Sequence, residues 1–227
     1  MLNPDVFPKT ESRFFIKGPV GQLELLTTYP SRETQRVAVI CHPHPLYQGT
    51  MNNKVVTTLA KSFDELGLAT VRFNFRGVGK SAGSSTGQAL AESEIRNYEH
   101  AGELDDLQAV LEWVKESLAG AKFWLAGFSF GSYVAAKLAE TWPTEQLISI
   151  APPVERMPFA DLKNIHCPWL VVQGDEDEIV SPAAVVAFAA NPPSPLQLIL
   201  LPGVSHFFHG RLLDLRDSLL REFNANT

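Results

Sequence analysis

The sequence predicts a three-layer α/β/α sandwich with a mostly parallel, twisted sheet, and two observations support this fold class. Short apolar runs alternate along the chain with segments whose apolar residues recur at helical spacing, which is the pattern of a parallel sheet covered by helices on both faces. One of these runs, residues 37–41 (VAVIC), is apolar throughout, as a strand buried on both faces should be. Ligands of such sheets bind beyond the carboxyl ends of the strands, so we expect a site in the loops that follow them.

Each element follows from its local pattern. We expect strands over residues 37–41, 69–73, 123–126, 146–150, 169–173 and 196–201, with residues 23–29 as an antiparallel edge strand. Helices are expected over residues 55–66, 104–118, 131–140, 182–190 and 212–223. Gly67 stands where a helix needs a C-terminal cap, and Ser181 before Pro182 is a typical helix start. The alternation contains no linker or internal repeat, so we expect one domain over residues 1–227.

Composition narrows the class of protein. The 227 residues are 45% hydrophobic and 19% charged, which is ordinary globular usage. The net charge of −6 argues against nucleic acid or an anionic membrane as the main partner. Two cysteines, Cys41 and Cys167, are too few for a secreted disulfide scaffold. Residues 1–13 lack the apolar region of a signal peptide, and prolines interrupt the uncharged residues 179–208. We therefore expect a cytoplasmic protein.

The sharpest local signal is a glycine–serine motif between a strand and a helix. Gly127, Ser129 and Gly131 stand in the sequence GFSFG, directly after the strand that ends at residue 126. A nucleophile on a tight strand-to-helix turn needs small neighbours two positions away, because the turn forces its backbone into a strained conformation. Ser129 is therefore the expected nucleophile.

A serine hydroxyl needs a base to remove its proton and an acid to orient that base. The loop after the strand at 169–173 contains two candidate acids, Asp175 and Asp177. The loop after the strand at 196–201 contains His206, with His209 three residues later. Chain order is thus serine, acid, histidine, and this is one of the known orders of a catalytic triad.

The sequence resembles the α/β-hydrolase superfamily, in particular its small lidless members related to dienelactone hydrolases and carboxylesterases. It is similar to a bacterial subgroup of predicted hydrolases that is marked by three motifs, HPHP at residues 42–45, GTMNNK at 49–54 and RFNFRGVG at 72–79. The resemblance runs from about Phe14 to the last helix. This chain departs from the dienelactone hydrolases, which usually have a cysteine nucleophile, by having Ser129.

The resemblance also implies which of the rival residues belong to the triad. In the superfamily the acid and the base each usually stand three residues after a glycine, which selects Asp177 and His206. Asp175 is then expected to cap its own loop. His209 is expected near the start of the last helix, exposed or partly buried.

An oxyanion hole is expected from two backbone N–H groups. One should belong to Phe130, the residue after the nucleophile. The other should come from the loop after residue 41, where Pro43 and Pro45 have no N–H to donate. His44 stands between them and is the expected donor, with Leu46 as the alternative.

The substrate pocket should be shallow and open. Only 18 residues separate Ile150 from Trp169, too few for the lid domain that many relatives insert there. The residues expected to line the pocket are Leu46, Phe128, Phe130, Met157 and Phe159. An open apolar site suits a modest acyl group and gives little selectivity.

Together these features predict a serine hydrolase that cleaves a carboxylic ester or thioester of a small molecule through an acyl-enzyme. No cofactor is required, and no metal is expected, because His42 and His44 have no third ligand nearby in sequence. Two alternatives stay open: an acyltransferase or peptidase with the same triad, and a non-enzymatic interaction protein on the same scaffold. The chain is expected to act as a monomer or a homodimer.

Overall fold

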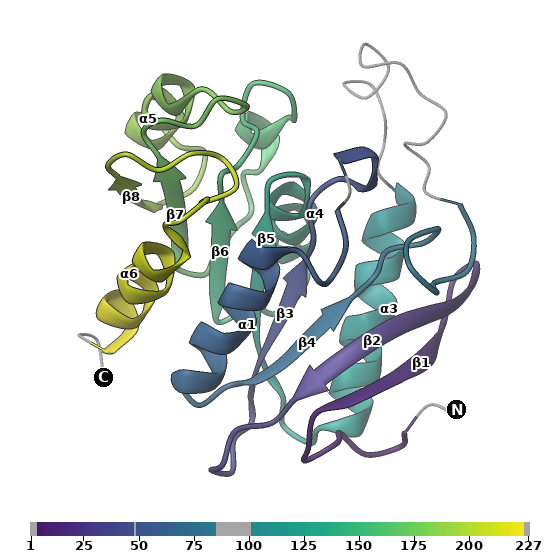
Figure 1. Ribbon diagram of the computed structural model, residues 1–227. Helices are drawn as coiled ribbons and strands as arrows, with labels where there is room; N and C mark the ends of the chain where they lie inside the picture. Colours follow the sequence, from purple (N-terminus) through teal and green to yellow (C-terminus); the bar gives the residue numbers. More distant parts are fainter. Residues whose placement is uncertain (1–3, 48, 85–100, 225–227) are drawn as a thin grey trace.

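The computed structural model describes residues 4–47, 49–84 and 101–224. These residues form an eight-stranded sheet with helices on both faces (Figure 1). The strands are β1 (Ser12–Gly18), β2 (Gly21–Thr28), β3 (Arg36–Cys41), β4 (Ala69–Phe73), β5 (Lys122–Phe128), β6 (Gln146–Ile150), β7 (Trp169–Gly174) and β8 (Gln197–Leu201). The helices are α1 (Lys54–Glu65), α3 (Ala101–Ser117), α4 (Phe130–Ala139), α5 (Pro182–Ala190) and α6 (Leu212–Asn224), with 3-10 turns η1 (Pro45–Tyr47) and η3 (Phe159–Asp161). The predicted fold class is confirmed.

The order of strands in the sheet is β1-β2-β4-β3-β5-β6-β7-β8. Strands β3 to β8 pair in parallel, whereas β2 pairs antiparallel to both β1 and β4. The predicted edge strand over residues 23–29 is therefore β2, which is not an edge. The edge position belongs to β1, which buries Phe14 and Ile16 on one face only and places Phe14 opposite Leu25.

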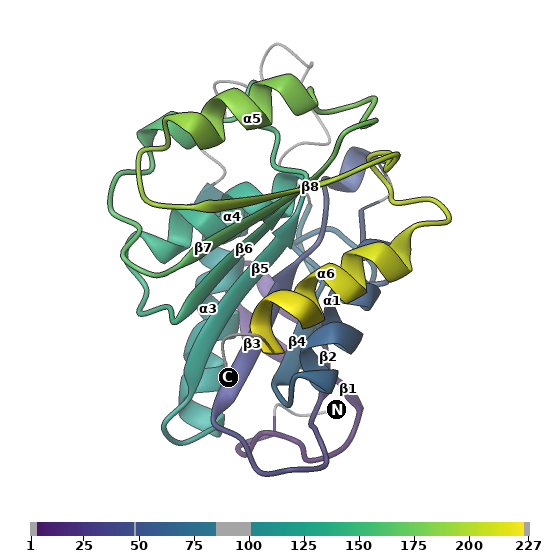
Figure 2. The same cartoon turned by 90° about the vertical axis from the view of Figure 1, so that its left-hand side faces the viewer.

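Each face of the sheet has its own apolar core. Alternate residues of β3 show the division, since Val37 and Val39 belong to the core under α3, α4 and α5, while Ala38 and Ile40 belong to the core under α1 and α6. The side view separates the two layers clearly, with α3, α4 and α5 on one side of the sheet and α1 and α6 on the other (Figure 2). This double burial is why the parallel strands are apolar without interruption.

The predicted helix boundaries match closely, and two of their capping signals are confirmed. Gly67 follows α1 with φ +81°, a left-handed conformation that favours glycine. The Ser181 side chain accepts a hydrogen bond from the N–H of Ala184 at 3.2 Å, at the start of α5. Among the described residues, no helix has both the length and the apolar character needed to cross a membrane.

The carboxyl ends of the parallel strands meet at one edge of the molecule. In Figure 1 the arrowheads of β3, β5, β6 and β7 point to the same end. The connection from β6 to β7, residues 151–168, contains the short turn η3 and no lid domain. This connection therefore adds no separate domain over the loops at this end of the sheet.

Candidate active site

Ser129 occupies a sharp turn between β5 and α4. Its φ of 51° and ψ of −120° are strained for a residue with a side chain, and its N–H donates to the carbonyl oxygen of Ile150 at 2.8 Å. A Cβ atom on Gly127 would lie 2.1 Å from the carbonyl oxygen of Gly131, and one on Gly131 would lie 2.5 Å from that of Cys41. Both glycines are thus required by close backbone approach, as the motif predicts.

The structure brings Asp177 and His206 together. Their side chains meet across 2.8 Å, between Oδ2 of the aspartate and Nδ1 of the histidine. Both residues are almost fully buried, with exposed fractions of 7% for Asp177 and 2% for His206. This bond therefore joins the loops that follow β7 and β8, although the two partners are 29 positions apart in sequence.

The Asp177 carboxylate accepts four hydrogen bonds. Oδ1 accepts from the backbone N–H groups of Ile179 (2.9 Å) and Val180 (2.7 Å), while Oδ2 accepts from Gln173 Nε2 (2.9 Å) and His206 Nδ1. Burial alone would raise the pKa of this carboxyl, but the hydrogen bonds, that of His206 foremost, hold the pKa below its usual value. An ionised carboxylate only accepts, so the His206 proton lies on Nδ1 and Nε2 is left as the basic nitrogen.

Ser129 and His206 line the same cavity, which has a volume of about 440 Å³. Within the part of the chain that the structure describes, no hydrogen bond joins the Ser129 hydroxyl to His206. Such bonds are often long in a free enzyme and shorten when substrate binds. The geometry thus places Ser129 and His206 at one cavity, with Asp177 bonded to His206.

The residues predicted for the oxyanion hole also line this cavity. His44 and Phe130 are neighbours, with ring centroids 4.9 Å apart. The carbonyl oxygen of His44 accepts from the N–H groups of Tyr47 (3.1 Å) and Gly49 (3.2 Å), which orders the loop. Leu46, the alternative donor, lies inside η1. The structure therefore places His44 and Phe130 at the same cavity as Ser129.

His42 is a residue whose role the sequence did not reveal. It is fully buried, its Nδ1 donates to the carbonyl oxygen of Pro43 at 2.7 Å, and its Nε2 accepts from the N–H of Phe75 at 3.1 Å. Burial lowers the pKa of His42 to about 4, so the ring is neutral near pH 7. With both nitrogens engaged, His42 anchors the loop that carries His44.

The predicted pocket residues are only partly found at the cavity. Met157 lines it, together with Ile179, Val180 and other residues of the same end. The prediction that Phe128 and Phe159 line the pocket is wrong, because both are fully buried and neither lines the cavity. Phe128 belongs to the core under α1 and α6 and its ring lies 5.0 Å from that of His206. Phe159 packs into the opposite core. The side chain of Leu46 lies outside the described residues.

The two rival residues lie apart from the Asp177–His206 pair. The carboxylate of Asp175 accepts the N–H of Gly203 at 2.6 Å, which makes it the loop cap that was expected. His209 is exposed and precedes α6 by a few residues. The neighbouring Glu178 is a further acidic residue at the site, since its Oε2 accepts the backbone N–H of His206 at 3.1 Å.

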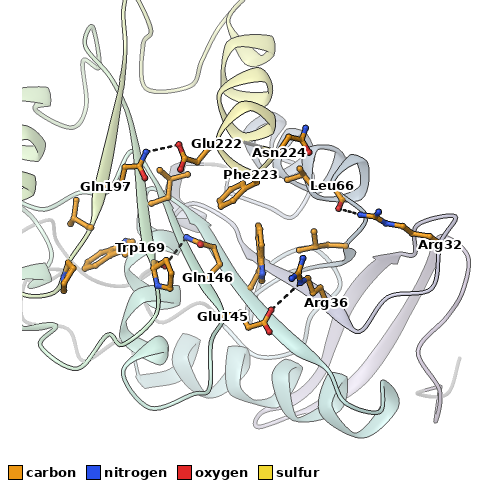
Figure 3. A pocket seen from close by; sticks show the side chains of 16 residues that line it. Arg32, Arg36, Leu66, Glu145, Gln146, Trp169, Gln197, Glu222, Phe223 and Asn224 are labelled. Atoms are coloured by element: carbon orange, nitrogen blue, oxygen red, sulfur yellow. Dashed lines mark hydrogen bonds and ion pairs between the residues drawn. The ribbon is translucent and has the colours of Figure 1, made fainter. Parts of the chain in front are cut away.

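A larger hollow of about 870 Å³ lies at the opposite ends of the strands (Figure 3). Its polar side chains are bonded within the protein: Arg36 pairs with Glu145, and Gln197 donates to Glu222. Among the sixteen described residues that line it, none is serine, threonine, cysteine or histidine. We therefore assign the chemistry to the smaller cavity.

Comparison with known proteins agrees with this geometry. Residues 46–155 match the family described as the α/β hydrolase fold. A solved α/β serine hydrolase homologue from Coxiella burnetii is 51% identical, covers 95% of this chain and 99% of its own, and superposes with a TM-score of 0.86.

Two more relatives extend the comparison. A structure from Xanthomonas campestris, described as an α/β serine hydrolase without a lid, is 42% identical, with 96% of this chain and 95% of that chain covered and a TM-score of 0.84. An uncharacterised protein of Rickettsia prowazekii is 32% identical over 206 residues, which are 86% of this chain and 82% of that protein. The chain therefore belongs to the α/β-hydrolase family and is similar to its lidless serine hydrolases.

Proposed function

We propose that the protein is a serine hydrolase that cleaves a carboxylic ester or thioester of a small acyl substrate. The observation that carries the proposal is the Asp177–His206 pair, joined at 2.8 Å, with His206 and the strained Ser129 lining one cavity. Acyl transfer to water through a serine nucleophile uses this set of groups: the nucleophile, a base to activate it and an acid to orient the base.

In the proposed reaction Ser129 Oγ attacks the carbonyl carbon of the substrate while His206 Nε2 takes the hydroxyl proton. The tetrahedral intermediate collapses, the bond to the alcohol or thiol breaks, and His206 returns the proton to that leaving group. Water then attacks the acyl-enzyme with His206 again as base, which releases the carboxylic acid and restores the serine. Asp177 keeps Nδ1 protonated and stabilises the imidazolium that forms twice in the cycle.

The negative oxygen of the intermediate is proposed to bind the N–H groups of Phe130 and His44. The adjacency of these two residues beside Ser129 supports this assignment. Phe130 is the first residue of α4, so its N–H lies at the positive end of a helix dipole. Donors held in place before the reaction stabilise the transition state without reorganisation.

The cavity supports a small acyl group as substrate. Its volume of about 440 Å³ is at the lower end of ligand pockets, and Met157, Ile179 and Val180 give it apolar walls. The proposed steps use only protein groups and water, so no cofactor is needed. A net charge of −6 likewise favours a small molecule over nucleic acid.

Fluorophosphonate labelling followed by a panel of p-nitrophenyl esters and acyl thioesters tests the proposal. We expect labelling at Ser129 and hydrolysis that Ser129→Ala reduces by several powers of ten while the protein stays folded. Acyl products formed on an added alcohol or amine, in place of free acid, would indicate a transferase. Labelling at another serine, or none, would overturn the assignment and favour a non-enzymatic scaffold.

A further inference from the structure

Gln173 lies directly behind the acid of the proposed triad. It is the penultimate residue of β7 and has no exposed surface. Its Nε2 donates to Asp177 Oδ2 at 2.9 Å and to the carbonyl oxygen of Gly174 at 3.0 Å. Asp177 Oδ2 is also the oxygen that accepts from His206. Gln173 does not line the cavity, so it cannot touch the substrate there.

The orientation of this amide follows from its surroundings. Both partners of Nε2 are acceptors, so the reversed amide would point a carbonyl oxygen at two other oxygens. In the observed orientation Oε1 of Gln173 is buried and has no hydrogen-bond partner among the described residues. A buried acceptor without a partner is destabilising, and a methionine would fill similar space without it. Packing alone therefore does not explain a glutamine at this position.

We propose that Gln173 is a positioning residue, which holds the Asp177 carboxylate ionised and in the plane that His206 requires. The inference rests on the proposed serine hydrolase function. The two backbone donors fix only Oδ1 of the carboxylate. The amide of Gln173 fixes Oδ2, which is the oxygen that orients the imidazole.

Loss of this donor has two physical consequences. The pKa of Asp177 should rise, because one of the hydrogen bonds that stabilise its charged form is gone. The carboxylate also gains rotational freedom, so the imidazole is less often aligned with Ser129. The substitution leaves the hydrogen bonds of the other charged groups nearby in place. Glu178 still accepts from the backbone N–H of His206, and Asp175 still accepts from the N–H of Gly203.

The experiment compares two changes at Gln173 with a matched control. Gln173→Met removes the amide and keeps the length of the side chain. Gln173→Glu keeps the shape, donates a hydrogen bond only while protonated, and repels Asp177 when ionised. The control is Gln146→Met: Gln146 is also buried, and its Nε2 donates to the carbonyl oxygens of Leu147 and Pro168, both at 3.0 Å, at the other end of the sheet.

We expect Gln173→Met to lower kcat by about 10–100-fold, the scale seen when residues that orient catalytic groups are removed, with KM unchanged. The activity of Gln173→Glu relative to that of the wild type at the same pH should be highest at low pH, and it should fall as pH rises and the glutamate ionises. Gln146→Met should keep the wild-type kcat. A carboxyl NMR titration should show a raised pKa of Asp177 in Gln173→Met and an unchanged one in Gln146→Met.

The outcomes distinguish a positioning role of Gln173 from a merely structural one. Wild-type kcat and an unchanged Asp177 pKa in Gln173→Met would overturn the inference, as would an equal loss of kcat in Gln146→Met. Thermal unfolding of every variant separates misfolding from mispositioning, and if Gln173→Met fails to fold, the pH profile of Gln173→Glu decides. The NMR titration needs no activity, so it tests the contact even if Ser129 proves not to be a nucleophile.

Discussion

The N–H of Phe75 donates a hydrogen bond to Nε2 of His42 across 3.1 Å. This bond joins the loop after β4 to the loop after β3, which carries His44. Because the other ring nitrogen of His42 donates to Pro43, the imidazole can serve both loops only in its neutral form. A proton on Nε2 would remove the acceptor that Phe75 needs.

Stability should therefore depend on the protonation of His42. The pKa of His42 is about 4 in the folded protein, against an ordinary 6.5. As pH falls from 7 to 4, His42 takes up a proton in the unfolded chain but stays largely neutral in the folded protein. The contribution of His42 should therefore lower the free energy of unfolding by about 3 kcal/mol over this range.

His42→Phe tests this linkage by chemical denaturation at several pH values. The variant should be less stable at pH 7 by about 1–3 kcal/mol, because the buried N–H of Phe75 loses its acceptor. Its stability should also fall less steeply between pH 7 and 4 than that of the wild type. Equal slopes in the two proteins would show that His42 is not the group responsible.

Substitution of the two aspartates in the loop after β7 should have very different effects on turnover. Asp177→Asn should reduce turnover by roughly 10⁴, the scale seen when a triad acid is neutralised. Asp175→Asn should reduce turnover much less, because the carboxylate of Asp175 accepts from the N–H of Gly203, whereas His206 is bonded to Asp177. Steady-state kinetics on a p-nitrophenyl ester measure both, and the reverse order of damage would make Asp175 the acid.

Activity should rise from acid toward neutral pH. The reason is that His206 must be neutral to accept the serine proton. His206→Ala should abolish both the activity and this ascending limb, whereas His209→Ala should preserve both, since His209 is exposed and outside the Asp177–His206 pair. An active His206→Ala enzyme with an unchanged profile would exclude His206 as the base.

The backbone rather than the imidazole of His44 should act on the oxyanion. His44→Ala keeps an N–H and should retain most activity. His44→Pro removes the donor and should lose about 10²–10³ in turnover, besides any effect of loop distortion. In a structure with a bound phosphonate, the phosphonate oxygen should lie within about 3 Å of the Phe130 and His44 nitrogens. If His44→Ala were as inactive as His44→Pro, the side chain would be the working group.

The parallel strands could be predicted because burial on both faces requires continuous apolar runs, such as residues 37–41. The same rule does not predict β1, because β1 is not buried on both faces. It is an edge strand with one exposed face, and Arg13 and Lys17 flank its apolar residues. Its existence depends on pairing with β2, and the β1 sequence alone does not encode that pairing.

The residue pattern predicted Ser129 as the nucleophile, because the turn requires glycines on either side. The loops after the strands narrowed the acid to Asp175 or Asp177 and the base to His206 or His209, and the family resemblance then selected Asp177 and His206. The side chains that support these residues became apparent only in the folded protein. Gln173 on Asp177, and His42 between Pro43 and Phe75, are contacts made by buried side chains of neighbouring strands and loops. The directions of those side chains depend on packing across the sheet, for which local residue patterns carry no signal.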